Sequence, residues 1–378
     1  MPKPPENPLH VLTVAPSWVG DVVMATPALR RVREALPGAT IALLHKPGIA
    51  GVVDGFDTDL GLVDELIPAH PGGMMGHKHT AAKLRHHRFD TALLLTNSFS
   101  TALTARMAGI PRRIGYDRDG RGLLLTHRLR APKRDGSWAI VPAVDYYWHA
   151  AGALLAVPCG SAEGDLEAAN GAGDHRLPAG AFLELGVSDA DEAAADELLA
   201  KANIDGERFA ILNPGGNNPA KRWPADRFAE LARWLTATHG LRVFVNGSPA
   251  EADLAQSIAE AAHTPNSRAE SLPAIGGTLG GLKALVRRAA VMVTNDTGPR
   301  HFAAALGTPV VTLFGPTDHR WTTIPTRPSG PEAVLTADPT LPESESANAH
   351  PEGCRVDRIG LDRVREAVDT VLKGEEPA

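Results

Sequence analysis

The sequence predicts an α/β protein made of two similar halves, and three observations lead to this fold class. Short apolar runs of strand length alternate with helical patterns, as in parallel sheets wound with helices. A stretch over residues 161–180 is rich in Gly, Ala and acidic residues, which is typical of an exposed connector. The alternation then restarts. We therefore expect an N-terminal domain over residues 1–187 and a C-terminal domain over residues 188–358.

The candidate elements follow this order along the chain. Apolar runs predict strands in the first half over residues 10–15, 41–45, 91–96 and 113–116. Helical patterns start at residue 27 and cover about 100–108 and 143–155. In the second half the predicted strands are 209–213, 242–246, 291–294 and 310–314. The last segment, 359–378, has the spacing of an amphipathic helix, which we expect to pack back across the domains.

Composition and charge narrow the class of protein. The 378 residues are 43% hydrophobic and 22% charged, which is typical of a soluble globular protein. A formal net charge of -6 and the lack of a binding motif argue against nucleic acid as a partner. Cys159 and Cys354 are too few for a disulfide framework or a cysteine metal cluster. Since no signal peptide or membrane-spanning run is found, we expect a cytoplasmic protein.

The most informative stretch covers residues 291–318. It predicts a buried strand, a polar Asn-Asp-Thr-Gly corner over residues 295–298, a helix that carries His301, and a second buried strand. Backbone N–H groups and the positive end of the helix dipole converge at such a corner, which suits a phosphate. An ordinary turn with Asp296 as the helix N-cap is the alternative.

A second polar position follows the first predicted strand. Gly20 and Asp21 lie in the expected loop between this strand and the next helix, where open α/β sheets bind their ligands. A helix cap is the alternative role for Asp21. Two halves that each carry a polar corner imply a cleft between them.

Five motifs resemble, in the same order, those of a known family. They are PSWVGD (16–21), TNSFSTAL (96–103), RIGY (113–116), PAKRWP (219–224) and TNDTG with the following histidine (294–301). They resemble the ADP-heptose:lipopolysaccharide heptosyltransferases of glycosyltransferase family nine, most closely the heptosyltransferase II group. The resemblance implies the GT-B fold, in which two Rossmann-like domains face a central cleft, the first binding mainly the acceptor and the second the nucleotide sugar.

The same resemblance implies an activity. This is the transfer of heptose from ADP-L-glycero-beta-D-manno-heptose to the heptosylated inner core of lipopolysaccharide, with inversion and without a metal ion or cofactor. Asp21 would be the general base, and Lys221 would stabilise the diphosphate as negative charge develops on it. An exposed loop lysine is the alternative reading of Lys221. We expect Trp223 to pack in the interior rather than bind a ligand.

Five further residues are candidates for donor binding. Thr297 and Gly298 would offer N–H groups and a hydroxyl to the diphosphate, and Asp296 would order the corner. His301 would either bond a phosphate or hold the corner in shape. Glu251 matches the family's acidic residue for the ribose, with helix N-terminal charge complementarity as its alternative. Nearby, Arg300 departs from the family pattern and would either contact a phosphate or be solvated.

Candidates for the acceptor side come from the first half. They are Asn97, Ser98 and Arg113. The basic segment 77–90 would suit a phosphorylated inner-core sugar, with a solvated basic helix as the alternative. Because the acceptor is a lipid, we also expect transient contact with the inner face of the inner membrane.

Other classes of protein are weighed against this reading. The Asp-x-Asp spacings at 57–59 and 189–191 are typical of metal-dependent transferases, but their settings favour solvated surface. A dehydrogenase is disfavoured because no Gly-x-Gly-x-x-Gly follows the relevant strands. A GT-B transferase with another nucleotide sugar or glycan acceptor, and a nucleotide-binding protein without catalysis, stay as alternatives.

Overall fold

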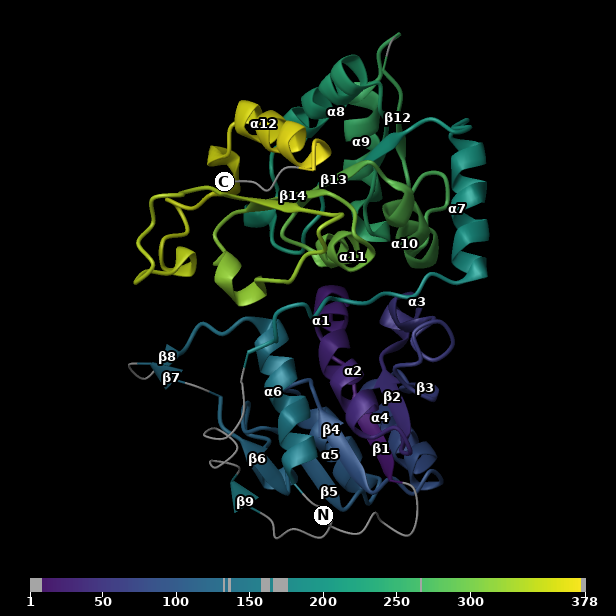
Figure 1. The fold of residues 1–378 in the computed structure, drawn as a ribbon, viewed down its shortest axis with the longest axis vertical. Helices are drawn as coiled ribbons and strands as arrows, with labels where there is room; N and C mark the ends of the chain where they lie inside the picture. Colours follow the sequence, from purple (N-terminus) through teal and green to yellow (C-terminus); the bar gives the residue numbers. More distant parts are fainter. Residues whose placement is uncertain are drawn as a thin grey trace. The chain divides into compact units, whose positions relative to one another are not determined.

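The structure is a computed structural model that describes residues 9–131, 133–134, 137–157, 164–165, 176–265 and 267–374. The chain divides into two compact units, Met1–Gly186 and Val187–Ala378, here called unit 1 and unit 2. Each unit contains a parallel sheet covered by helices (Figure 1). Cys159 lies outside the described residues.

The sheet of unit 1 has the strand order β3-β2-β1-β4-β5-β6-β9, and all its neighbouring strands run parallel. A separate antiparallel pair is formed by β7 (Lys133–Arg134) and β8 (Ser137–Trp138). The strands of the main sheet are β1 (His10–Val14), β2 (Thr40–His45), β3 (Glu65–Pro68), β4 (Thr91–Leu94), β5 (Arg112–Tyr116), β6 (His127–Leu129) and β9 (Gly164–Asp165).

Helices cover both faces of this sheet because its central strands are apolar on both sides. Leu12 and Leu94 pack in one core with α4 and α5, whereas Val11 alternates to the other face, on the side of α2 and α6 (Figure 1). The helices are α1 (Val19–Met24), α2 (Thr26–Ala35), α3 (Ala50–Val53), α4 (Gly73–Arg85), α5 (Phe99–Met107) and α6 (Ala143–Ala156), with short 3-10 turns η1 (Pro47–Ile49) and η2 (Gly122–Leu124).

The sheet of unit 2 repeats the same topology, with the parallel order β12-β11-β10-β13-β14-β15. Its strands are β10 (Phe209–Asn213), β11 (Arg242–Val245), β12 (Ala269–Ser271), β13 (Val291–Asn295), β14 (Val310–Phe314) and β15 (Glu332–Thr336).

One face of this sheet is covered by α8, α9 and α12, which share a core with the buried Trp223 (Figure 1). The indole of Trp223 donates to the carbonyl of Ile359 over 2.8 Å, so this side chain packs in the interior as expected. The helices are α7 (Asp189–Lys201), α8 (Ala225–His239), α9 (Ala252–Ala262), α10 (Leu279–Arg288), α11 (Gly298–Leu306) and α12 (Leu361–Leu372), with 3-10 turns η4 (Pro219–Lys221), η5 (Pro249–Glu251), η6 (His319–Thr322), η7 (Ala347–Ala349) and η8 (Val356–Arg358).

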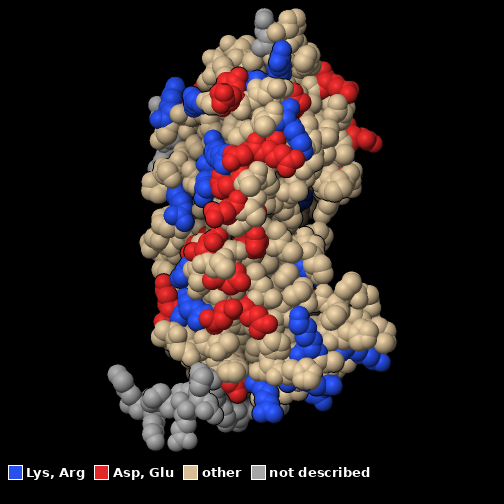
Figure 2. All heavy atoms as spheres, turned by 90° about the vertical axis from the view of Figure 1, so that its right-hand side faces the viewer, with Lys and Arg blue, Asp and Glu red and all other residues tan. Residues whose placement is uncertain are grey.

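Charges of both signs meet between α7 and α10, at the surface and in the interior. Arg288 pairs with Asp196 at 2.6 Å, and Lys283, which is fully buried, pairs with Asp191 at 2.7 Å. Figure 2 shows basic and acidic side chains side by side on the face of unit 2 that carries α7. This face is therefore not a uniformly basic surface.

The predicted α/β architecture is confirmed, and every predicted strand is present within two residues of its expected ends. The strands β3, β6, β12 and β15 and the two-residue strands β7, β8 and β9 were not predicted. β3 ends in proline, and β12 and β15 contain an acidic residue. Helix α10 was also not predicted, since it contains two glycines and a buried lysine, Lys283, whose charge is paired with Asp191.

Candidate functional site

Both sheets reverse their strand order at one place, and the polar residues predicted from the sequence follow these strands. The order reverses between β1 and β4 in unit 1 and between β10 and β13 in unit 2. Open α/β sheets bind ligands at the carboxyl ends of such strand pairs. Asp21 and Asn97 follow β1 and β4, whereas Lys221 follows β10 and the corner over residues 295–298 lies at the end of β13.

Asp21 lies in the first turn of α1, which begins at Val19. The sequence predicted a loop position before the helix, and this prediction is wrong. Its Oδ1 accepts a hydrogen bond from the phenol of Tyr147 on α6, with 2.8 Å between the oxygens. Burial and the charge of Asp21 raise the pKa of Tyr147 well above its ordinary value, so the phenol stays a neutral donor. An uncharged phenol is thus one of the groups that hold this carboxylate.

Asn97 and Ser98 connect β4 to α5. The side-chain oxygen of Asn97 accepts hydrogen bonds from Arg121 at 3.1 Å and from the phenol of Tyr146 at 3.0 Å. Ser98 is the N-cap residue of α5, and its hydroxyl lies 2.8 Å from that of Ser100. Both predicted acceptor-side residues therefore lie at the same sheet edge as Asp21.

The structure does not bring Arg113 to this edge. It lies near the amino end of β5, where its buried guanidinium donates to the carbonyls of Leu124 at 2.7 Å and Ile110 at 2.6 Å. These contacts tie backbone segments together, so Arg113 has a structural role instead of the predicted one. The basic segment 77–90 begins within α4, whose Lys78 is exposed, and thus fits a solvated basic helix.

In unit 2, the polar corner leads directly into α11. The N-cap is Thr297 and not Asp296, and no side chain of the described residues caps this helix. The hydroxyl of Thr297 instead accepts a hydrogen bond of 2.6 Å from Asn213 at the end of β10. Pro299 has no N–H, and the N–H of Arg300 donates to the carbonyl of Thr297 at 3.2 Å. The first turn therefore offers an anion the N–H of Gly298 and the positive end of the helix dipole.

Lys221 forms an ion pair with the carboxylate of Asp296. The Nζ to Oδ2 distance is 2.8 Å, and the side chains are 23% and 7% exposed, respectively. Lys221 is thus not a loose surface lysine. The ammonium of Lys221 lies beside the N-terminus of α11. A diphosphate bound there would compete with the carboxylate of Asp296 for this ammonium.

Glu251 forms a capping box with Ser248. Its carboxylate accepts bonds from the Ser248 N–H at 2.9 Å and from the Gly216 N–H at 2.6 Å. Although burial raises the pKa of Glu251, a hydrogen bond from the Ser248 hydroxyl at 2.7 Å and the two N–H bonds lower it below its ordinary value overall. A Cβ at Gly215 would lie 2.6 Å from this carboxylate, so only glycine allows the approach. Glu251 therefore joins the two loops that follow β10 and β11.

His301 is buried beneath the corner. Its Nδ1 lies 3.2 Å from the carbonyl of Gly298, so this nitrogen carries the proton in the neutral ring. Nε2 is buried and has no hydrogen-bond partner among the described residues. Burial, followed by the charge of Arg300, lowers the pKa of His301 to about 4. The ring is therefore neutral at physiological pH.

Neither of the two predicted roles holds for Arg300. Its guanidinium is buried and pairs with Glu332, with Nε to Oε1 at 2.6 Å, and also donates to the carbonyl of Thr322 at 2.7 Å. Arg300 thus joins the first turn of α11 to β15 and η6, and is neither solvated nor directed at the corner.

Three asparagines hold the loops of unit 2 together, and of these only Asn295 was part of a predicted site feature, the polar corner. Asn246 donates to Asn213 at 2.6 Å, which in turn donates to Thr297. Asn295 donates to the carbonyl of Pro214 at 2.7 Å. Each is the last residue of its strand or the residue after it, and that position is the signal by which they could have been found.

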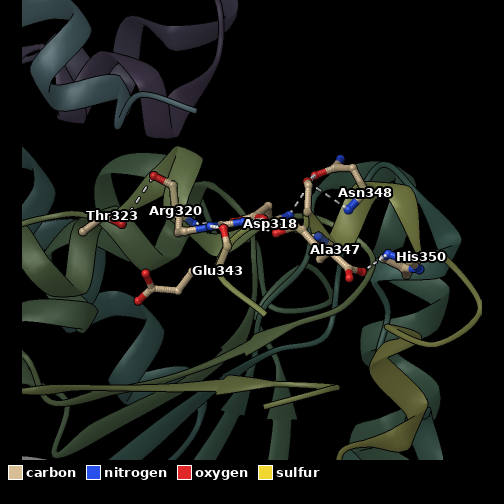
Figure 3. A network of polar contacts seen from close by, with 9 residues as sticks. Asp318, Arg320, Thr323, Glu343, Ala347, Asn348 and His350 are labelled. Carbon is tan, nitrogen blue, oxygen red and sulfur yellow. Dashed lines mark hydrogen bonds and ion pairs between the residues drawn. The ribbon is translucent and has the colours of Figure 1, made fainter. Parts of the chain in front are cut away.

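Another unpredicted group follows β14. Arg320 donates to Asp318 at 2.6 Å and to the carbonyl of Glu343 at 2.5 Å, and Asp318 also accepts from the N–H of Ala347 at 3.3 Å (Figure 3). Although burial raises the pKa of Asp318, the hydrogen bonds from Arg320 lower it to about 2. The pair anchors the long segment between β15 and α12.

The described residues contain no group of histidine, cysteine or acidic side chains that could hold a metal ion. Both Asp-x-Asp segments thus lack metal-site geometry, and Asp191 is committed to Lys283 and Ser188. Among the described helices, none is long and apolar enough to cross a membrane.

Comparisons with known proteins agree with this topology. The sequence profile of glycosyltransferase family 9 (heptosyltransferase) matches residues 78–350. Lipopolysaccharide heptosyltransferase 2 of Escherichia coli strain K12 is 29% identical over 322 residues, which cover 83% of this chain and 85% of that protein. Lipooligosaccharide heptosyltransferase 2 of Haemophilus influenzae is 27% identical over 328 residues, covering 83% and 85%.

Two solved structures are similar over nearly the whole chain. ADP-heptose lipopolysaccharide heptosyltransferase II of Escherichia coli has a TM-score of 0.74 and 26% identity, covering 97% of this chain and 99% of that chain. A family 9 glycosyltransferase of Veillonella parvula has a TM-score of 0.73 and 21% identity, covering 97% of each, and supports the fold alone. The GT-B fold class is thereby confirmed, and the chain belongs to glycosyltransferase family 9, a family of sugar-transferring enzymes.

Proposed function

We propose that the protein transfers heptose from ADP-heptose to the heptosylated inner core of lipopolysaccharide, with inversion and without a metal ion. Family membership and the relatives named heptosyltransferase 2 support the sugar and the acceptor, and the similar structure named for ADP-heptose supports the donor. The observation that carries the chemistry is Lys221 beside the uncapped N-terminus of α11, a cationic site suited to a diphosphate.

Unit 2 binds the donor in this proposal. The N–H groups of Thr297 and Gly298 and the ammonium of Lys221 contact the diphosphate. Because Asp296 neutralises Lys221 before the donor arrives, the ammonium must share or exchange its partner on binding. Donor affinity therefore depends on how far the diphosphate outcompetes one carboxylate.

Glu251 and His301 have supporting roles in donor binding. The carboxylate of Glu251 bonds the ribose with the acceptor positions that its capping bonds leave open. In the neutral tautomer of His301, Nε2 is an acceptor and cannot donate to a phosphate. Of its two roles, we therefore propose that His301 holds the corner in shape.

The transfer itself is a single displacement. Asp21 takes the proton of the acceptor hydroxyl, whose oxygen forms a bond to the anomeric carbon on the side opposite the diphosphate. The bond between that carbon and the diphosphate oxygen breaks, and ADP leaves with the electron pair. Inversion follows from one attack. Lys221 and the N-terminus of α11 stabilise the charge that a divalent ion stabilises in metal-dependent transferases.

The acceptor binds at the carboxyl edge of the unit 1 sheet, where Asn97 and Ser98 lie. Large apolar side chains are exposed after the strands that end at this edge: Trp18 (66%) after β1, Met74 (56%) and Met75 (57%) after β3, and Phe99 (48%) after β4. An edge of this kind suits the cytoplasmic surface of the membrane that carries a lipid acceptor.

Membrane contact is tested by sedimentation with vesicles that contain anionic lipids. We expect the protein to cosediment with them, and the variant Trp18→Ser/Phe99→Ser to cosediment less while retaining its ADP affinity. The exposed Val334 of unit 2 gives the control variant Val334→Ser, which should bind vesicles like the wild type. Equal binding by all three proteins would exclude this edge as the contact.

Asp21→Asn tests the reaction. We expect it to lower kcat by about 10²- to 10⁴-fold while ADP binds with unchanged affinity, because only proton removal from the acceptor is lost. Transfer is measured with ADP-heptose and with other nucleotide sugars on a truncated inner-core acceptor. Wild-type turnover by the variant would rule out Asp21 as the base, and preference for another sugar would rule out the proposed donor.

A further inference from the structure

Two consecutive tyrosines on α6 each contact a polar residue at the switch point of unit 1. The switch point of a unit is the place where its strand order reverses, between β1 and β4 in unit 1 and between β10 and β13 in unit 2. Tyr147 donates to Asp21, which follows β1, and Tyr146 donates to Asn97, which follows β4. Successive helix residues point about 100° apart, so one helix reaches both strands. The two rings accordingly meet at an interplanar angle of 80° with their centroids 6.0 Å apart.

The orientation of the Asn97 amide follows from its partners. Arg121 is fully buried and can only donate, so the atom 3.1 Å from its Nη2 must be the amide oxygen. Tyr146 donates to the same oxygen. The amide nitrogen makes no hydrogen bond to a described residue, so its two N–H groups are the part of Asn97 left for a ligand.

The tyrosines are themselves held in place. Tyr116 stacks on Tyr146 with ring centroids 3.7 Å apart, and its phenol donates to the Tyr146 carbonyl at 3.0 Å. Tyr147 is only 7% exposed. Burial raises the pKa of Tyr146 to about 12, so it also remains an uncharged donor near neutral pH. This cluster is rigid and carries no charge on its phenols.

We propose that Tyr146 and Tyr147 are positioning residues for the acceptor half of the reaction. Tyr147 fixes the carboxylate of Asp21 and stabilises its charged form. Tyr146 and Arg121 together turn the Asn97 amide so that it donates to an oxygen of the acceptor sugar. The proposal rests on the proposed function for the identity of this acceptor, but the state of Asp21 can be measured without turnover.

Tyr147→Phe and Tyr146→Phe separate the two tasks. In Tyr147→Phe the ionised carboxylate of Asp21 loses a hydrogen-bond donor, so its pKa should rise by about one unit. The acid limb of the kcat/KM profile should shift upward by the same amount. In Tyr146→Phe the acceptor KM should rise about 5- to 10-fold with little change in the donor KM. The matched control is Tyr116→Phe, which removes a phenol of the same cluster that touches neither Asp21 nor Asn97.

Carboxyl ¹³C NMR titration of Asp21, assigned with Asp21→Asn, provides a readout that needs no substrate. An unshifted Asp21 titration in Tyr147→Phe, or an equal acceptor KM in Tyr146→Phe and Tyr116→Phe, overturns the corresponding assignment. Thermal unfolding of all three variants tests for general loss of structure. If the wild type transfers no heptose, the proposed function fails, and the titration still decides the role of Tyr147.

Discussion

The two switch points have the same topology but hold their polar residues by different means. In unit 1, the phenols of Tyr146 and Tyr147 orient Asn97 and Asp21. In unit 2, Lys221 and Asp296 hold each other through opposite charges. The phenol of Tyr147 donates a hydrogen bond to the Asp21 carboxylate without adding a charge, whereas the ion pair keeps a cation beside the corner of unit 2. The contrast fits a proton acceptor in unit 1 and a diphosphate site in unit 2.

The difference extends to the scaffold behind each site. Unit 2 buries Arg300 with Glu332 behind α11, and Glu332 also accepts from Thr312 at 2.5 Å. Although burial raises the pKa of Glu332, the charge of Arg300 lowers it below its ordinary value overall. We therefore expect substitutions that remove a charge to have large effects on the stability and activity of unit 2. In unit 1, substitutions that remove a hydrogen bond should affect the acceptor edge.

The largest expected effect is the loss of this buried ion pair. Arg300→Ala leaves Glu332 charged and buried without its partner, so we expect the free energy of unfolding to fall by about 3 to 5 kcal/mol. Denaturant unfolding measures it. The control is Arg355→Ala, which breaks an exposed pair with Asp357 and should cost about 0 to 1 kcal/mol.

The double variant Arg300→Met/Glu332→Leu sharpens this comparison. Replacing both partners by apolar residues removes the uncompensated charge, so much of the stability lost in Arg300→Ala should return. A loss in Arg300→Ala as small as that in Arg355→Ala would show that the scaffold of unit 2 does not depend on this pair.

The next effect concerns catalysis rather than stability. Lys221→Ala removes the only side-chain cation assigned here to the diphosphate, so we expect kcat to fall by about 10²- to 10³-fold and ADP to bind more weakly. Steady-state kinetics and calorimetry measure the two changes. Lys201→Ala is the control, because Lys201 pairs with Glu197 on the exposed surface of α7.

An unchanged kcat in Lys221→Ala would assign the ion pair with Asp296 to structure alone. Unit 2 would then resemble unit 1 in using its contacts to hold a shape, and the contrast between the two sites would disappear. Loss of ADP affinity in Lys201→Ala as well would instead point to a long-range charge effect.

Sequence reasoning predicted most of the central strands and placed several candidate site residues next to their ends, but it did not find the partners of these residues. Asp21, Asn97 and Lys221 stand next to strand ends, and strand ends can be read from apolar periodicity. Their partners Tyr147, Tyr146 and Asp296 lie 126, 49 and 75 residues away in the chain, and no local pattern predicts such pairs.

Arg113 and Arg300 illustrate why residue type alone misleads. Both were expected near a ligand or in solvent because arginine is usually exposed and binds anions. Both are buried, one bound to backbone carbonyls and the other to Glu332. A buried arginine requires a complete set of acceptors, and these come from elements that the sequence does not show to be adjacent.

The smallest expected effect is a pH dependence of unit 2 that arises from His301. Its pKa is about 4 in the folded chain, below the ordinary 6.5, because the ring is buried. Between these values the unfolded chain binds a proton that the folded chain does not, so stability should fall as the pH falls from 6.5 to about 4. The total loss of stability should be up to about 3 kcal/mol.

His301→Gln should reduce the dependence of the free energy of unfolding on pH between 6.5 and about 4, measured by denaturant unfolding. His86→Gln, at an exposed site of unit 1, should leave this dependence unchanged. If the stability of His301→Gln depends on pH as strongly as that of the wild type, the buried ring takes up its proton as easily as an exposed one. A positive charge beneath this corner would then lower the stability of unit 2 no more than a charge at an exposed site of unit 1 lowers the stability of that unit.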